Sequence, residues 1–149
     1  MQPRKPLPPT YFYVAIVLII VLHVLVPGPQ VFSSPWRYLG VIPLIVGGAF
    51  SVLADQAFKR FGTTVKPFEE STCLVTDGVF RLSRNPMYLG FVLLLAGLVM
   101  LLGSTTSWIV VVIFPFLMEL HFIRAEETML EARFGDAWLQ YKQRVRKWL

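Results

Sequence analysis

The sequence predicts an all-α integral membrane protein with four transmembrane helices, a long cytoplasmic loop and a C-terminal amphipathic helix. Composition is the first indication: 55% of the 149 residues are hydrophobic and only 15% are charged, whereas about a quarter of a soluble domain is charged. The second is that the apolar residues form four long runs. The third is that the basic residues lie almost entirely on one side of these runs, as in membrane proteins generally.

The four apolar runs define the expected spans, which we place at residues 11–26, 36–58, 87–103 and 104–123. The first run, YFYVAIVLIIVLHVLV, contains no charge and is nearly as long as the roughly 20 residues needed to cross a bilayer. A cleaved signal peptide is the alternative, because Arg4 and Lys5 precede this run. No small-x-small cleavage site follows the run, however, and further spans do, which favours a retained helix.

Small residues indicate how the spans pack. Gly47 and Gly48 in the second span suit close contact between helices, and so do Gly90 and Gly97, which share one face of the third span. Only the short stretch GSTTS separates the third apolar run from the fourth. These two spans are therefore expected to form an antiparallel hairpin.

The remaining sequence is hydrophilic, and we expect residues 1–149 to form a single membrane domain. Residues 59–86 form a polar loop, and residues 124–149 form a charged helical segment that emerges from the membrane and lies along its surface. Basic residues occur before the first span, in this loop and in the tail, whereas the two opposite connections carry only Arg37. Both termini and the loop are therefore predicted to be cytoplasmic.

The residue types present exclude several other kinds of site. Cys73 is the only cysteine, so no internal disulfide is possible. With His23 and His121 as the only histidines, we expect no metal site. No G-x-G-x-x-G turn follows a strand, which excludes a nucleotide site of the Rossmann type.

Two polar segments hold most of the remaining chemistry. The first polar segment is TCLVTDGVFRLSRNPMYLG, residues 72–90, and the second is RAEETMLEARFGDAWLQYKQRVRKW, residues 124–148. The first enters the third span and the second leaves the fourth, so the hairpin brings both to the same membrane interface. They form either one site or a structural clasp.

Helix initiation explains part of the first polar segment. Pro86 is favourable at a helix start, and Asn85 before it is a suitable N-cap. Neither role explains why Arg81, Arg84 and Tyr88 lie beside them.

Carboxylates stand out in and before the second polar segment. Glu126 and Glu127 follow the expected end of the fourth span, where the helix macrodipole disfavours negative charge. Either the helix continues well past them or a positive partner offsets this cost. Glu119 and His121, at the edge of the span, are equally consistent with a functional site inside the bundle and with snorkelling to the interface.

Together the two segments resemble the isoprenylcysteine carboxyl methyltransferase family and its bacterial relatives, with the phospholipid N-methyltransferases as cousins. The family's first motif is leucine-valine-threonine, glycine, an aromatic residue and arginine-histidine-proline-x-tyrosine-x-glycine; it stands here as LVTDGVFRLSRNPMYLG. The second motif is a glutamate pair, phenylalanine-glycine, a tyrosine and a basic valine-arginine ending; it stands as EETMLEARFGDAWLQYKQRVRKW. The resemblance covers residues 63–148, and Asn85 replaces the family's histidine.

This resemblance implies that the loop and the C-terminal helix form a pocket for S-adenosyl-L-methionine. The implied cofactor-binding residues are Thr72, Cys73, Leu74, Val75, Phe80, Arg84, Asn85, Pro86, Met87, Tyr88, Glu126 and Glu127. Arg124 and Glu127 are the implied catalytic residues. Arg124 is also the implied contact to the acceptor, and we add Glu119 and His121 as substrate-binding candidates.

The expected function is methyl transfer from S-adenosylmethionine to a lipid-like or isoprenoid acceptor at the cytoplasmic face of a bacterial or archaeal cell membrane. No nucleic-acid partner is expected. A carboxylate or thiolate acceptor needs no general base, whereas an amine must first lose a proton, for which Glu119 or His121 would be candidates. The acceptor and the oligomeric state stay open, and phospholipid N-methylation is an alternative within the same class.

Two other classes of function also stay open. Membrane sterol and steroid reductases, which bind NADPH, carry a segment similar to RNPMYLG and a tail similar to FGDAWLQY. Those enzymes have an acidic residue where Phe91 stands here. A non-enzymatic lipid-binding or scaffold protein is the third reading, and it predicts no affinity for either soluble cofactor.

Overall fold

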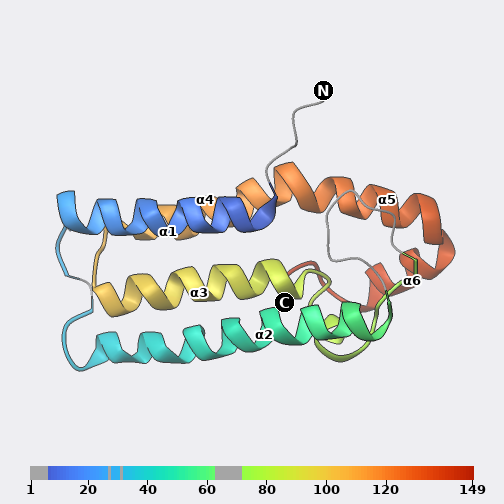
Figure 1. The fold of residues 1–149 in the computed structure, drawn as a ribbon, viewed down its shortest axis with the longest axis horizontal. Coiled ribbons are helices and arrows are strands. Elements are labelled where there is room, and N and C mark those ends of the chain that lie inside the picture. Colours follow the sequence, from blue (N-terminus) through green and yellow to red (C-terminus); the bar gives the residue numbers. More distant parts are fainter. Residues whose placement is uncertain (1–6, 27, 31, 63–71) are drawn as a thin grey trace.

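The fold is known from a computed structural model that describes residues 7–26, 28–30, 32–62 and 72–149, and within these ranges every regular element is a helix. Four helices run side by side: α1 (Pro8–Leu25), α2 (Val41–Arg60), α3 (Pro86–Leu102) and α4 (Trp108–Met118) (Figure 1). Helices α5 (Arg124–Phe134) and α6 (Asp136–Arg144) lie at one end of this bundle, and short helical turns lie at Trp36–Gly40 and Gly78–Arg81. The all-α prediction is confirmed for the described residues. Arg4, Lys5 and Lys66, which contributed to the charge argument, lie outside them.

The helices have the length and surface of membrane spans. Three helical stretches are long and apolar enough to cross a bilayer, namely Pro8–Leu25, Trp36–Arg60 and Trp108–Phe134, and α3 is a shorter apolar helix. Large apolar side chains point away from the bundle: Val24, Ile45 and Phe116 are 69%, 67% and 64% exposed. Such a surface is stable in contact with lipid and not with water. The structure is therefore consistent with an integral membrane protein.

Helices α2 and α3 pack backbone against backbone. A Cβ atom on Gly47 would lie 2.6 Å from the carbonyl oxygen of Gly90, and one on Gly97 would lie 2.6 Å from that of Gly40. Both distances are too short for a real side chain, so glycine is required at these positions. The contact expected at Gly48 is wrong, because a Cβ there would meet no described atom within 4 Å.

Helix α4 begins at Trp108, later than the expected Ser104. Hydroxyl groups before the helix bond to neighbouring chain segments and not to a first helical turn. The Ser107 hydroxyl donates to the Ile19 carbonyl oxygen of α1 at 3.1 Å and lies 2.9 Å from the Ser104 hydroxyl. Such local competition for backbone groups is why serine is a poor helix former.

One continuous helical stretch connects the membrane to the second polar segment. Helix α4 passes through a π-helical turn, Glu119–Ile123, directly into α5, and the stretch Trp108–Phe134 contains 27 residues. At about 1.5 Å per residue it is about 40 Å long, which exceeds the roughly 30 Å of bilayer hydrocarbon. Glu126 and Glu127 therefore lie in the middle of a helix and not at its C-terminus. Gly135, with a φ of 49°, separates α5 from α6.

Candidate functional site

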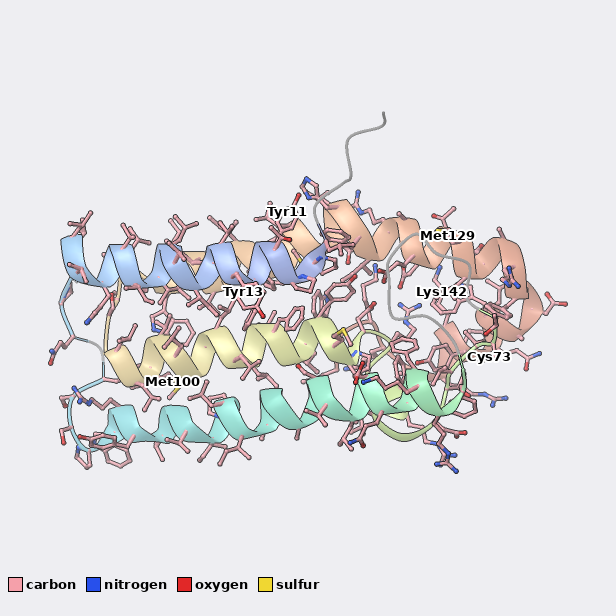
Figure 2. The ribbon with its side chains drawn as sticks, in the orientation of Figure 1. Tyr11, Tyr13, Cys73, Met100, Met129 and Lys142 are labelled. Carbon is pink, nitrogen blue, oxygen red and sulfur yellow. The ribbon has the colours of Figure 1, made fainter. Side chains whose placement is uncertain are left out.

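The two polar segments meet at the end of the bundle that carries α5 and α6 (Figure 1). Figure 2 shows Cys73 of the first segment at the same end as Met129 and Lys142 of the second, with Met100 toward the opposite end. Specific contacts join them: the Tyr88 hydroxyl donates to Glu126 Oε1 at 2.7 Å, and Arg84 Nη2 lies 3.3 Å from Glu127 Oε1. The expected meeting of the segments is confirmed by these contacts.

The start of α3 positions the first of these partners. Pro86 occupies the first turn of the helix, as expected, and Asn85 occupies the N-cap position. The side chain of Asn85 makes no capping hydrogen bond; its Nδ2 donates to the Lys147 carbonyl oxygen at 3.1 Å. Pro86 therefore favours helix initiation without a side-chain cap, and Asn85 binds a residue near the C-terminus instead.

The π-helical turn aligns two carboxylates of the long helix. In a regular α-helix, residues seven positions apart point the same way, but a π turn inserts one extra residue into the repeat. Glu119 is therefore aligned with Glu127 and not with Glu126. Lys147 bridges the aligned pair, because its Nζ lies 2.7 Å from Glu119 Oε1 and 3.3 Å from Glu127 Oε2.

We call this set of six charged and phenolic side chains the polar cluster; its members are Arg84, Tyr88, Glu119, Glu126, Glu127 and Lys147. The Arg84 and Glu127 side chains are only 7% and 14% exposed, so the ion pair between them lies in a medium of low polarity. The Arg84 guanidinium also lies over the Trp138 ring, 5.5 Å from its centroid.

Several atoms in and beside the polar cluster are buried without a hydrogen-bond partner among the described residues. The donors are Arg84 Nε and Nη1 and Trp138 Nε1, and the acceptors are Glu127 Oε1 and Glu119 Oε2. Buried polar atoms almost always have a partner, so a concentration of exceptions indicates a place where a ligand or water belongs.

Other predicted cofactor residues lie further from the polar cluster. The Thr72 hydroxyl donates to the Gly62 carbonyl oxygen at 3.4 Å, and Cys73 Sγ to that of Phe61 at 3.5 Å, which ties the loop to the end of α2. Val75, Phe80 and, more peripherally, Leu74 and Met87 belong to a hydrophobic cluster around Trp138 and Tyr141.

Tyr141 of α6 holds the first segment in this hydrophobic cluster. Its hydroxyl donates to the Phe80 carbonyl oxygen at 2.7 Å, and burial raises the pKa of the phenol above its ordinary value. The rings of Tyr141 and Trp138 are 5.8 Å apart. Tyr141 thus connects the first polar segment to the side chain on which Arg84 rests.

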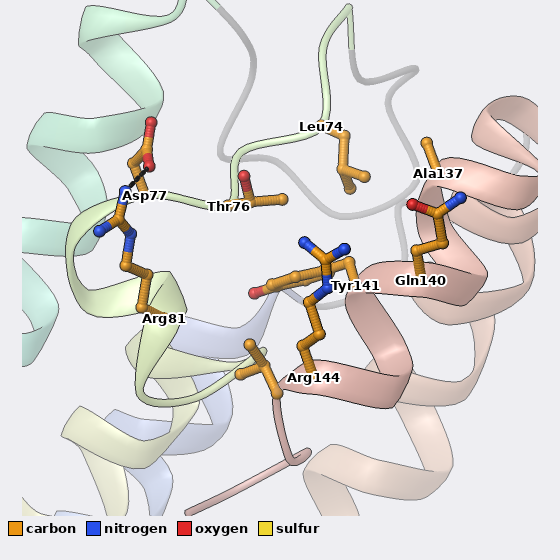
Figure 3. Close-up of a pocket in the computed structure, with 9 residues that line it drawn as sticks. Leu74, Thr76, Asp77, Arg81, Ala137, Gln140, Tyr141 and Arg144 are labelled. Carbon is orange, nitrogen blue, oxygen red and sulfur yellow. Dashed lines mark hydrogen bonds and ion pairs between the residues drawn. The ribbon is translucent and has the colours of Figure 1, made fainter.

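Tyr141 also lines an open cleft of about 690 Å³ (Figure 3). Its walls come from the first polar segment, from α6 and from the residue that follows α6: Leu74, Thr76, Asp77, Arg81, Ala137, Gln140, Tyr141, Arg144 and Val145. Arg81 is paired with Asp77 at 2.7 Å across one edge. The volume falls in the usual range of small-molecule sites, about 300–1,000 Å³. Leu74 is the predicted cofactor residue that lines this cleft.

The three expected acceptor contacts are placed differently. Glu119 belongs to the polar cluster. Arg124 is 66% exposed, and its Nε lies 3.6 Å from Glu119 Oε1, so it stands at the rim. His121 is exposed, its Nδ1 is 3.0 Å from the Leu117 carbonyl oxygen, and its ring centroid is 5.6 Å from that of Tyr11. The structure therefore does not bring His121 to the cluster.

Two residues at this site were not predicted from the sequence. Lys147 is one of several basic residues in the charged tail, and no local sequence pattern distinguishes it from the others. Trp138 stands in the FGDAWLQY motif, but its contact with Arg84 depends on how α6 folds back. Among the described residues, no group of three or more potential ligands is arranged to hold a metal ion.

Comparison with known proteins decides the family. A sequence model described as phospholipid methyltransferase matches residues 36–137, about two thirds of the chain. The chain belongs to the phospholipid methyltransferase family. The resemblance inferred from the two motifs is confirmed, and membership in the phospholipid methyltransferase family favours methyl transfer over the reductase alternative. The matched range contains five of the six members of the polar cluster. It ends before the sixth, Lys147.

Two of the relatives with similar sequences carry the name of a methyltransferase. Protein-S-isoprenylcysteine O-methyltransferase of Schizosaccharomyces pombe is 38% identical over 96 residues, which are 63% of this chain and 39% of that protein. The protein of the same name from Saccharomyces cerevisiae is 36% identical over 112 residues, 72% of this chain and 46% of that protein. An uncharacterized protein of Haemophilus influenzae is 43% identical over 63 residues, 42% of this chain and all of that protein. The chain thus spans less than half the length of the two yeast relatives.

Proposed function

We propose that this protein is an integral membrane methyltransferase that uses S-adenosylmethionine to methylate a hydrophobic acceptor at the membrane interface. Family membership supports the chemistry, and the apolar helices support the location. The observation that carries the proposal is the junction of the polar segments, where Tyr88 binds Glu126 and Arg84 faces Glu127. Charged groups gathered at one end of apolar helices suit an enzyme that joins a water-soluble donor to a lipid-soluble acceptor.

The residues present fit this cofactor. S-adenosylmethionine carries a carboxylate, an ammonium group, a sulfonium and ribose hydroxyls. The donors of Arg84 and Trp138 that lack a hydrogen bond suit the carboxylate. Glu119 Oε2 and Glu127 Oε1, the latter in an ion pair with Arg84 but without a hydrogen bond, suit the ammonium group or the hydroxyls. Donors and acceptors left unsatisfied side by side favour a ligand that bears charges of both signs.

The cofactor would supply a methyl carbon activated by positively charged sulfur. Arg84 and Trp138 would hold the carboxylate, and Glu127 would fix the other end of the amino-acid group. Methyl transfer is an in-line displacement, so alignment and exclusion of water contribute most of the rate enhancement. Tyr88, whose ring stacks near Phe122 with centroids 6.4 Å apart, is buried and keeps water from the junction.

A carboxylate acceptor of the isoprenylcysteine type fits the rim better than an amine. Exposed Arg124 is a suitable cation to bind such a carboxylate at the interface. An amine would need a general base, but His121 points away from the cluster and Glu119 is engaged with Lys147 and Arg124. We therefore assign Arg124 to acceptor binding, whereas Glu127 would hold the amino-acid group of the donor.

The polar end is proposed to face the cytoplasm, where the donor is dissolved. Cys73 is the only cysteine and lies at this end, so it reports the orientation directly (Figure 2). A membrane-impermeant maleimide should label Cys73 in inverted vesicles and not in intact cells. Labelling of intact cells alone would reverse the proposed orientation.

Binding of the cofactor tests the function itself. The full chain, purified in detergent or nanodiscs, is titrated by calorimetry with S-adenosylmethionine and, separately, with NADPH. We expect binding of the former alone. Incubation of membranes with the deuteromethyl-labelled donor, followed by mass spectrometry of the lipid extract, then identifies the acceptor. Binding of NADPH alone would establish the reductase alternative, and binding of neither would refute both.

A further inference from the structure

The last residues of the chain return to the polar cluster and are fixed there. The backbone N–H of Arg84 donates to the Arg146 carbonyl oxygen at 3.0 Å, and the Lys147 carbonyl oxygen accepts from the Ser83 hydroxyl and from Asn85 Nδ2, each at 3.1 Å. Three hydrogen bonds thus set the backbone position of Lys147. Its side chain is directed, not free to sample the solvent.

Lys147 places its ammonium group between the two carboxylates that the π turn aligns. Nζ is 2.7 Å from Glu119 and 3.3 Å from Glu127, and the three side chains are 29%, 20% and 14% exposed. Burial lowers the pKa of Lys147, but hydrogen bonds and attraction to Glu119 and Glu127 outweigh this effect and raise it. The ammonium group is therefore charged at every physiological pH.

Lys147 thereby changes the charge that a ligand meets. Arg84, Arg124 and Lys147 are the cations beside the carboxyl groups of Glu119, Glu126 and Glu127. Removal of Lys147 would make the polar cluster more negative by one charge. In a partly buried site of low effective dielectric, one charge changes the binding of a cation far more than that of a neutral molecule.

We propose that Lys147 is a specificity-determining residue that sets how strongly the site prefers a positively charged ligand over a neutral one of the same shape. The inference rests on the proposed function. S-adenosylmethionine and S-adenosylhomocysteine share the adenosine and the amino-acid group, but the donor carries a sulfonium charge that the product lacks. The positive charge of Lys147 offsets the negative charges of Glu119 and Glu127. It thereby limits how strongly the site stabilises the sulfonium charge of the bound donor, a charge that is lost when the methyl group is transferred.

The ratio of the two dissociation constants measures this role, because a merely structural change would weaken both ligands alike. The full-length protein and its variants are titrated by calorimetry with each ligand at a pH of about 8, where carboxylates are ionised. Lys147→Gln should shift the ratio roughly tenfold in favour of the donor. Lys147→Arg should keep the wild-type ratio. Lys142→Gln, which removes a surface partner of Glu131, is the matched control and should also leave it unchanged.

A second pair of variants keeps the test valid if Lys147→Gln folds poorly. Glu119→Gln should shift the ratio toward the neutral product, and the double variant Glu119→Gln with Lys147→Gln should restore it. A wild-type ratio in both Lys147→Gln and Glu119→Gln, with binding intact, would overturn the role of Lys147 and leave the proposed function standing. Absence of binding to both ligands in the wild type would instead refute the proposed function and the inference with it.

Discussion

The hydroxyl of Tyr88 donates a hydrogen bond of 2.7 Å to Oε1 of Glu126 and so joins the first turn of α3 to α5. The two residues belong to different polar segments, and the whole hairpin of α3 and α4 separates them in the chain. Tyr88 is only 7% exposed, so bulk water is no substitute partner for either group. This bond is a structural tie as well as part of the candidate site.

Replacement of Tyr88 by phenylalanine should therefore destabilise the protein. The ring remains, but Glu126 loses a buried donor, at a cost of about 1–3 kcal/mol. We expect a lower midpoint of thermal unfolding in nanodiscs, measured by tryptophan fluorescence. Tyr13→Phe is the matched control, since Tyr13 is 66% exposed on the outer face of α1. Equal midpoints for both variants would show that the hydrogen bond contributes nothing.

Arg84→Lys should separate ligand binding from stability. Lysine keeps the positive charge beside Glu127 but lacks the planar fork that supplies the unpartnered Nε and Nη1 donors. We expect at least roughly tenfold weaker binding of S-adenosylmethionine by calorimetry, with a smaller change in unfolding temperature. Arg37→Lys is the control, because Arg37 lies in the helical turn Trp36–Gly40 at the opposite end of the bundle. Unchanged binding by Arg84→Lys would mean that the cofactor carboxylate lies elsewhere.

Much of this architecture could be predicted because it depends on patterns along the chain. Apolar runs gave the positions of the helices, and the short GSTTS connection required the two polar segments to share one end. Close contact was expected at Gly90 and Gly97 from their spacing and at Gly47 from its small size, and the structure has it at all three positions. The same expectation was wrong at Gly48, because which side of α2 faces α3 depends on the rotation of the packed helix.

What the sequence did not predict depends on long-range placement. Nothing in the run of basic residues distinguishes Lys147 from its neighbours, since its role arises when the chain end returns to α3. The π turn shifts the register so that Glu119 meets Glu127, and a regular helical repeat would pair it with Glu126 instead. Asn85 was expected to cap α3, but its side chain binds the Lys147 carbonyl oxygen.

The glycines of α2 offer a matched pair of neighbouring substitutions. Gly47→Ala places a Cβ atom 2.6 Å from a backbone oxygen of α3 and must push the helices apart, at a cost of about 1–3 kcal/mol or more. Gly48→Ala meets open space and should be neutral or stabilise the helix by up to about 1 kcal/mol. Unfolding midpoints of the two variants in the same nanodiscs give the comparison. Similar destabilisation by both would contradict the backbone contact between α2 and α3.

Alkaline pH should lower the stability of the protein through two titrating groups, Tyr141 and Lys147. Burial raises the pKa of Tyr141 above its ordinary value of 10.0, and the carboxylates around Lys147 raise its pKa above 10.5 despite the opposing effect of burial. In both cases the folded state holds the proton more tightly than the unfolded state. The stability that these groups contribute is therefore fully present below about pH 10 and is lost as the pH rises through the folded-state values.

The unfolding midpoint should accordingly show no loss from these groups between about pH 7 and pH 9 and should fall above about pH 10. Tyr141→Phe removes one of the two groups, so its midpoint should fall less steeply with pH than that of the wild type. Parallel curves for wild type and Tyr141→Phe would mean that the phenol is not buried against the Phe80 carbonyl oxygen, and that α6 does not close over the first polar segment as the structure shows.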